Sequence, residues 1–236
     1  MKPHPDHRGG SGMTPLVVSL VVALAGSGCA STPAGPPAPG EARGAVPSLG
    51  GVEVLVLPVQ RTRVDREAAD RELAFALTTR GPAVTWIGPV EIERRVSQSA
   101  MNLSLDRLPI DAFFQADVTR VGDPVYGILR RAASLTGALY AIIPLSLAPS
   151  PSSGPEAKPG LEVMATLIEI RTGTVFWIGT LSAEGDPADP ATLARLMDEL
   201  ARTLLPLGAD ETLLSTNRLL TNRLLTNRVR TERATR

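Results

Sequence analysis

The chain has 236 residues, of which 43% are hydrophobic and 3% aromatic, and its 24 basic and 24 acidic side chains give a formal net charge of zero. This balance is typical of a globular protein, and it excludes a strongly basic nucleic-acid binder and an acidic disordered chain. The length allows one domain of ordinary size or two small ones.

Cysteine and histidine occur only near the start of the chain, as Cys29, His4 and His7. One cysteine excludes an intramolecular disulfide and a cysteine-rich zinc site. If the chain is cut before Cys29, the mature protein has no histidine and no free thiol. These groups are the usual general bases, nucleophiles and soft-metal ligands, so we expect a protein that is not an enzyme and holds no metal or cofactor.

Residues 1–28 have the three parts of a secretory signal peptide. A polar start with two basic residues is followed by the apolar run LVVSLVVALA, and the small residues GSG stand directly before Cys29. The apolar run has about ten residues, whereas a membrane-spanning helix needs about 20. We therefore interpret the segment as an export signal; the alternative is a buried apolar strand with an incidental cysteine.

Small residues before a lone cysteine resemble the lipobox of bacterial lipoproteins, whose cysteine is acylated and becomes the new N-terminus. The resemblance implies lipidation of Cys29 with fatty acids such as palmitate. In that family an aspartate after the cysteine tends to signal retention in the inner membrane, and here the residue is Ala30. We therefore expect a lipid anchor in the outer membrane, with the protein on its periplasmic face.

Residues 29–51 are rich in proline, glycine and alanine and nearly free of large apolar side chains. Burial of apolar surface cannot offset the entropy of ordering such a segment, so an extended tether is expected. A proline-rich recognition motif is the alternative interpretation.

In residues 52–208 the spacing of apolar residues alternates between that of strands and that of helices, which predicts an α/β domain. Behind the expected export signal, this domain is periplasmic. The run VEVLVLPV is typical of a central strand that is covered on both faces. The next segment changes to helical spacing, with Thr62 available as its N-cap. The expected strands are residues 52–59, 83–87, 138–147, 161–170 and 174–182, and the expected helices are 62–80, one from Pro89, 123–137 and one from Asp189.

Particular residues mark the ends of these elements. Asp123 is expected to cap the third helix and Gly137 to end it. Pro144 cannot donate to a ladder, so its end of the strand is expected at an edge or a bulge. Residues 101–122 have no clean period and predict a loop with at most a short helix around Ala112. The fold class is therefore α/β (α+β): a single mixed sheet packed with about four helices, in the order β-α-β-α-α-β-β-β-α.

Residues 209–236 contain the five-residue repeat LSTNR, LLTNR, LLTNR, VRTER. Five residues match neither the heptad nor a solenoid unit, so we interpret this segment as a repetitive, arginine-rich, disordered tail. The alternative is that its arginines contact anionic lipid or polymer.

Few residues of the domain suggest chemistry. A divalent-ion site is conceivable in the loop that carries four aspartates, but their spacing lacks the pattern of a calcium loop. No phosphate-binding glycine motif occurs, and the rare aromatic residues are not interleaved with arginines, so nucleotides and nucleic acid are not expected as ligands. The four aspartates are Asp106, Asp111, Asp117 and Asp123.

Three segments carry a resemblance to a known group of envelope proteins: VLVLPV, LRRAASLTGALYAIIPLSL and ATLIEIRTGTVFWIG. They resemble the small α/β domain of the lipoprotein activators of penicillin-binding proteins, of the TolB N-terminal domain and of the curli-secretion lipoproteins. The resemblance implies a non-catalytic outer-membrane lipoprotein whose domain binds a protein or peptidoglycan-associated partner in envelope assembly or maintenance. The alternatives are an oligomeric subunit of an envelope secretion or trafficking assembly and, third, an enzyme.

Overall fold

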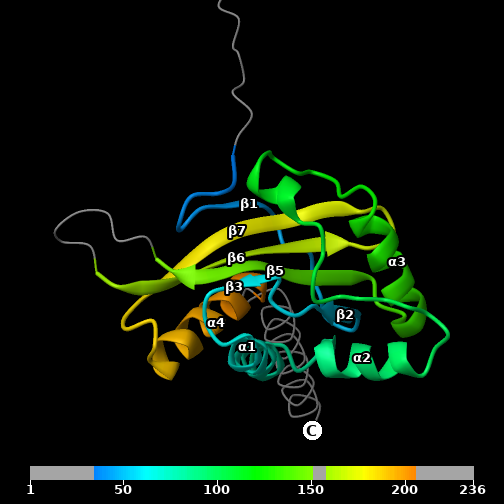
Figure 1. Ribbon diagram of the computed structural model, residues 1–236, viewed down its shortest axis with the longest axis horizontal. Helices are drawn as coiled ribbons and strands as arrows, with labels where there is room; N and C mark the ends of the chain where they lie inside the picture. The colour runs from blue at the N-terminus through cyan, green and yellow to red at the C-terminus, as the bar shows by residue number, and fades with distance from the viewer. Residues whose placement is uncertain (1–34, 151–157, 206–236) are drawn as a thin grey trace, which may run out of the picture. The chain divides into compact units, whose positions relative to one another are not determined.

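The computed structural model describes residues 35–150 and 158–205 (Figure 1). The predicted signal peptide (1–28), the predicted lipidation site Cys29 and the predicted tail (209–236) lie outside these residues and stay predictions. Within the described residues, no helix has both the length and the apolar character needed to cross a membrane.

The described residues build a mixed sheet of seven strands with four α-helices, which confirms the predicted fold class. The strand order is β1-β7-β6-β5-β2-β4, and the short strand β3 pairs with β5. The strands are β1 (Ala42–Gly44), β2 (Glu53–Val56), β3 (Arg61–Thr62), β4 (Thr85–Ile87), β5 (Tyr140–Pro149), β6 (Gly160–Glu169) and β7 (Thr174–Glu184). The helices are α1 (Arg66–Arg80), α2 (Pro89–Ser97), the short 3₁₀ helix η1 (Asp111–Phe114), α3 (Val125–Thr136) and α4 (Pro190–Leu204).

Two hydrophobic cores lie on the two faces of the sheet. One contains the apolar faces of α1 and α4, which Figure 1 shows beneath the sheet. The other contains residues of α2, α3 and the loop around η1. Strand β2 contributes Val54 and Val56 to the first core and Leu55 to the second, so the predicted two-sided covering of this strand is confirmed.

Strand β2 is parallel to both of its neighbours, β4 and β5. The connection from β2 to β4 contains β3 and α1, and the connection from β4 to β5 contains α2, η1 and α3. These two connections pack into different cores and so cover opposite faces of the sheet. The remaining pairs, β5 with β6, β6 with β7 and β7 with β1, are antiparallel.

Two details correct the sequence predictions. The N-cap of α1 is Asp65, whose carboxylate accepts hydrogen bonds from the first-turn amides. The predicted cap Thr62 lies instead in β3, where its hydroxyl accepts a hydrogen bond from the Val64 amide. Pro144 lies at a shift in the β5–β6 register, which confirms the bulge, one of the two placements expected for it; β5 is an interior strand and not an edge.

The second correction concerns the segment predicted as a tether. Residues 42–44 form β1 and pair with the edge of β7, and Leu49 is buried in the first core. The side chains of residues 42–44 show no strand pattern in the sequence. The strand forms because its backbone pairs with the edge of β7. The ordered domain therefore begins before residue 52.

The third predicted helix begins close to its expected start. Pro124 occupies the N-cap position of α3, one residue later than predicted. The Asp123 carboxylate still accepts a hydrogen bond from the Gly127 amide, at 3.1 Å. Gly137 ends the helix in the left-handed conformation, with φ of 80°, as predicted.

Candidate functional site

The four aspartates considered as metal ligands do not come together. Asp111 pairs with Arg61, and Asp117 pairs with Arg43 at 3.2 Å. Asp123 accepts a hydrogen bond from the Gly127 amide of α3, and Asp106 accepts one from a neighbouring serine. In the part of the chain that the structure describes, no group of three or more acidic, histidine or cysteine side chains is arranged to hold a metal ion.

A groove of about 380 Å³ lies where the chain leaves β2 and β4. We call it the α2 groove, because four residues of α2 line it together with the strand end at Pro58 and the loop 103–106. Its volume lies within the usual range for ligand sites, roughly 300–1,000 Å³. The lining residues are Pro58, Pro89, Glu93, Val96, Ser97, Leu103, Ser104, Leu105 and Asp106.

The topology of the sheet opens this groove. Strands β2 and β4 are parallel neighbours, so both carboxyl ends lie at the same edge of the sheet. The chain then turns to α1 on one face and to α2 on the other, and such a divergence leaves a crevice outside the strand ends. Pro58 and Pro89, which follow β2 and β4, have no backbone N–H to extend the ladder.

Two lining residues of the groove, Pro58 and Leu105, are held together by Gln60, which is only 6% exposed. Its Nε2 donates to the carbonyl oxygens of Pro58 at 2.7 Å and Leu105 at 2.9 Å. Its Oε1 accepts from the Leu108 amide at 2.7 Å. One buried carboxamide therefore ties the loop 103–108 to the end of β2 and satisfies backbone groups that would otherwise be buried without partners.

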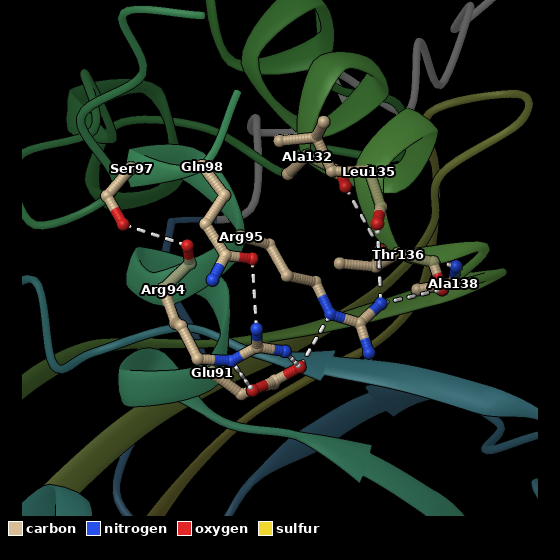
Figure 2. A network of polar contacts seen from close by, with 9 residues as sticks. All are labelled: Glu91, Arg94, Arg95, Ser97, Gln98, Ala132, Leu135, Thr136 and Ala138. Atoms are coloured by element: carbon tan, nitrogen blue, oxygen red, sulfur yellow. Dashed lines mark hydrogen bonds and ion pairs between the residues drawn. The ribbon is translucent and has the colours of Figure 1, made fainter. Parts of the chain in front are cut away.

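The wall formed by α2 is held against α3 by a polar network (Figure 2). Arg95 donates from Nε to Glu91 at 2.6 Å and from Nη1 to the carbonyl oxygens of Leu135 and Thr136 at 3.3 and 3.5 Å. Hydrogen bonds from Arg94 and Arg95 lower the pKa of the Glu91 carboxyl to about 2. The network thus joins α2 to the last carbonyls of α3, which carry the negative end of the helix dipole.

The charged side chains that line the groove are both acidic. Glu93 is exposed, and within the described residues its carboxylate takes part in no hydrogen bond or ion pair. Asp106 accepts a hydrogen bond from the Ser104 hydroxyl, which lowers the pKa of its carboxyl, and Arg107 lies 3.9 Å away with its side chain 88% exposed. The groove therefore presents two carboxylates and no lining cation.

A further carboxylate, Asp70 of α1, lies close to these two acids. Burial raises the pKa of the Asp70 carboxyl, and Glu93 adds to this rise by repulsion. A hydrogen bond from the Val59 amide, at 2.9 Å, and the charge of Arg66 act in the opposite direction. Negative charge near Pro58 therefore comes from α1, α2 and the loop.

Exposed apolar side chains also occur next to lining residues of the groove in the sequence. Val90, next to the lining residue Pro89, is 81% exposed, and Met101, two residues before Leu103, is 37% exposed. On the helix, Val90, Glu93 and Ser97 share one face because they are three and four residues apart. The exposed Val90 therefore lies on the same side of α2 as two lining residues, Glu93 and Ser97, and the nine residues of the helix span about 13 Å.

The sequence did not single out Gln60 or Glu93. Gln60 follows an apolar strand directly, but nothing in the sequence indicates that its partners lie about 45 residues later. Glu93 belongs to the helix predicted from Pro89, and nothing in its sequence position sets it apart from the other charged residues of that helix. The useful signal was the proline that follows each of the two parallel strands.

No protein family model matches this chain, and no curated protein matches it. Solved structures of bacterial envelope proteins are similar to it. PelC from Paraburkholderia phytofirmans, solved as a dodecamer of an L103M variant, is 17% identical over 70% of this chain and 97% of its own, with a TM-score of 0.42. The LpoB C-terminal domain from Salmonella enterica is 19% identical over 60% of this chain and 88% of its own, with a TM-score of 0.40.

Lipoprotein GNA1162 from Neisseria meningitidis is 14% identical over 66% of this chain and 98% of its own, with a TM-score of 0.37. The described domain is therefore similar, at low identity, to α/β domains of envelope lipoproteins, which is the resemblance predicted from the sequence. At these identities the likeness concerns architecture and does not extend to partners or activity.

Proposed function

We propose that this protein is an outer-membrane lipoprotein whose periplasmic domain works by binding a partner in the cell envelope and not by catalysis. The observation that carries the proposal is the α2 groove. It is preformed, because Gln60 ties the loop 103–108 to the end of β2 and Arg95 ties α2 to α3. A rigid groove with an apolar lining binds at a low entropic cost, since little has to be ordered on binding.

The expected lipid anchor at Cys29 would hold the binding domain at the membrane. A lipid anchor and a spacer keep the domain near the membrane, which raises its effective concentration for a partner held at the same surface. The proposed spacer would end before residue 42, where β1 pairs with β7. The proposed mechanism is tethered docking in envelope assembly or maintenance.

Photo-crosslinking in living cells tests this proposal. A crosslinking amino acid at Val90, next to the lining residue Pro89, is expected to give a discrete adduct with one partner. The same amino acid at Phe75, which is 70% exposed on α1, is the matched control and is expected to give none. Cys29→Ser is expected to reduce the Val90 adduct roughly tenfold or more, because the effective concentration is lost.

Two outcomes contradict the proposal. Equal adducts from Val90 and Phe75 would mean that the groove is not a binding surface. An adduct whose mass is twice that of the protein would assign the groove to a second copy of the chain, as in an oligomeric assembly.

A further inference from the structure

We infer that the α2 groove binds a segment of a partner protein that carries aliphatic side chains next to arginine or lysine. This inference rests on the proposed function, because it names the chemistry of the partner at the same site. Two observations support it: the apolar lining and the Glu93 carboxylate at the rim, which has no hydrogen bond or ion pair within the described residues.

The lining accounts for the aliphatic part of the ligand. Pro58, Pro89, Val96, Leu103 and Leu105 supply five of the nine lining residues. Apolar side chains that enter such a groove leave water, which contributes roughly 25 cal/mol per Å² of buried apolar area. The exposed side chains of Val90 and Met101, which are close in sequence to the lining residues Pro89 and Leu103, add apolar surface that a peptide could also contact.

The rim accounts for the basic part. Glu93 and Asp106 rise from α2 and from the loop, the two structures that border the groove. The nearby arginines have other partners: Arg94 and Arg95 bind Glu91, Arg66 donates to the Gln60 carbonyl oxygen at 3.2 Å, and Arg107 lies 3.9 Å from Asp106. A partner cation is therefore the complementary charge for Glu93, and such complementarity selects partners and orients them.

The test uses the full-length lipoprotein in neutral detergent and three labelled peptides, followed by fluorescence anisotropy up to millimolar concentration. GLRALRG combines both expected features. GLEALEG reverses its charge, and GSRASRG removes its leucines. We expect GLRALRG to bind at least tenfold more tightly than either control, and its binding to weaken as salt is raised, because charges at a rim are screened.

Variants assign the binding to the groove. Glu93→Gln is expected to weaken GLRALRG binding roughly three- to tenfold, as the loss of exposed ion pairs does. Ser97→Trp is expected to abolish binding by filling the groove. Glu199→Gln, on α4 at the other face of the sheet, is the matched control and is expected to change nothing. Positions 93 and 97 are exposed, so these variants are expected to unfold at the wild-type temperature.

Several results would overturn the inference. They are the absence of GLRALRG binding at millimolar concentration, equal binding of GLRALRG and GLEALEG, or full binding by Ser97→Trp. Binding that appears only after residues 209–236 are removed would assign the groove to the chain's own tail and would also overturn it. If the peptides fail while the Val90 crosslinker still captures a partner, this inference is wrong and the proposed function stands.

Discussion

Replacement of Gln60 by methionine tests whether one buried carboxamide holds the groove together. Methionine has a similar length but cannot make the three hydrogen bonds that Gln60 makes with Pro58, Leu105 and Leu108. Each such bond contributes about 0.5–1.5 kcal/mol net, and a buried backbone group left without a partner costs about 1–3 kcal/mol. We therefore expect Gln60→Met to lower the free energy of unfolding by about 2–4 kcal/mol.

The assay is urea unfolding of the domain followed by circular dichroism, with hydrogen exchange of residues 103–108 as a local readout. The exchange of these amides is expected to rise more than that of the β5–β6 hairpin, because Gln60 anchors only the loop. Gln98→Met is the matched control. Gln98 is exposed and bonded only to Arg94, so a change of less than about 0.5 kcal/mol is expected. If the Gln60→Met protein is as stable as the wild type, the Gln60 side chain does not hold the loop 103–108 in place.

Three further predictions concern the stability of the domain and the pairing of β1. Asp70→Asn is expected to raise the free energy of unfolding near pH 7 and to leave it unchanged near pH 3. Burial raises the pKa of the Asp70 carboxyl, so the cost of burying its charge appears only as pH rises. Arg95→Met is expected to cost about 1 kcal/mol, and the cost should shrink as pH falls from about 4.5 towards 2, where Glu91 becomes protonated. Gly44→Ala is expected to release β1 from the sheet, seen as faster amide exchange in β7, because Gly44 has φ of 82° and a Cβ there would lie 2.0 Å from the Phe176 carbonyl oxygen.

Each of these variants has a control that isolates its cause. For Asp70, the carbonyl oxygen of the new asparagine still accepts from the Val59 amide, so a loss of stability at every pH would contradict the desolvation argument. For Arg95, the control is Arg94→Met, since Arg94 also binds Glu91 but does not reach α3. For Gly44, the control is Gly51→Ala, because Gly51 shares a positive φ of 75° but has open space around it.

The sequence predicted the parts of the fold that depend on local pattern. The apolar run that contains β2, the glycine turn between β6 and β7 and the left-handed Gly137 follow from periodicity and turn chemistry, and the structure confirms them. The short strands β1 and β3 were not predicted. Their pairing depends on the edges that β7 and β5 offer, which is information held by the tertiary structure.

The groove was beyond sequence reasoning for the same reason. Its residues come from the end of β2, from α2 and from a loop without periodicity, and only the sheet topology brings them together. The loop was correctly expected to be irregular, with a short helix at η1. Its aspartates were considered as ligands of a metal, whereas Asp111 and Asp117 instead pair with arginines that hold the loop to β3 and β1.

The most direct test of the account is the intact mass of the protein extracted from membranes of cells that express the whole chain. The account predicts a product that lacks residues 1–28, begins at Cys29 and carries the added mass of fatty acyl chains. A Cys29→Ser protein is expected to keep residues 1–28 and to gain no acyl mass. An unmodified wild-type chain that retains residues 1–28 and leaves the membrane fraction with salt alone would contradict the anchor and, with it, tethered docking.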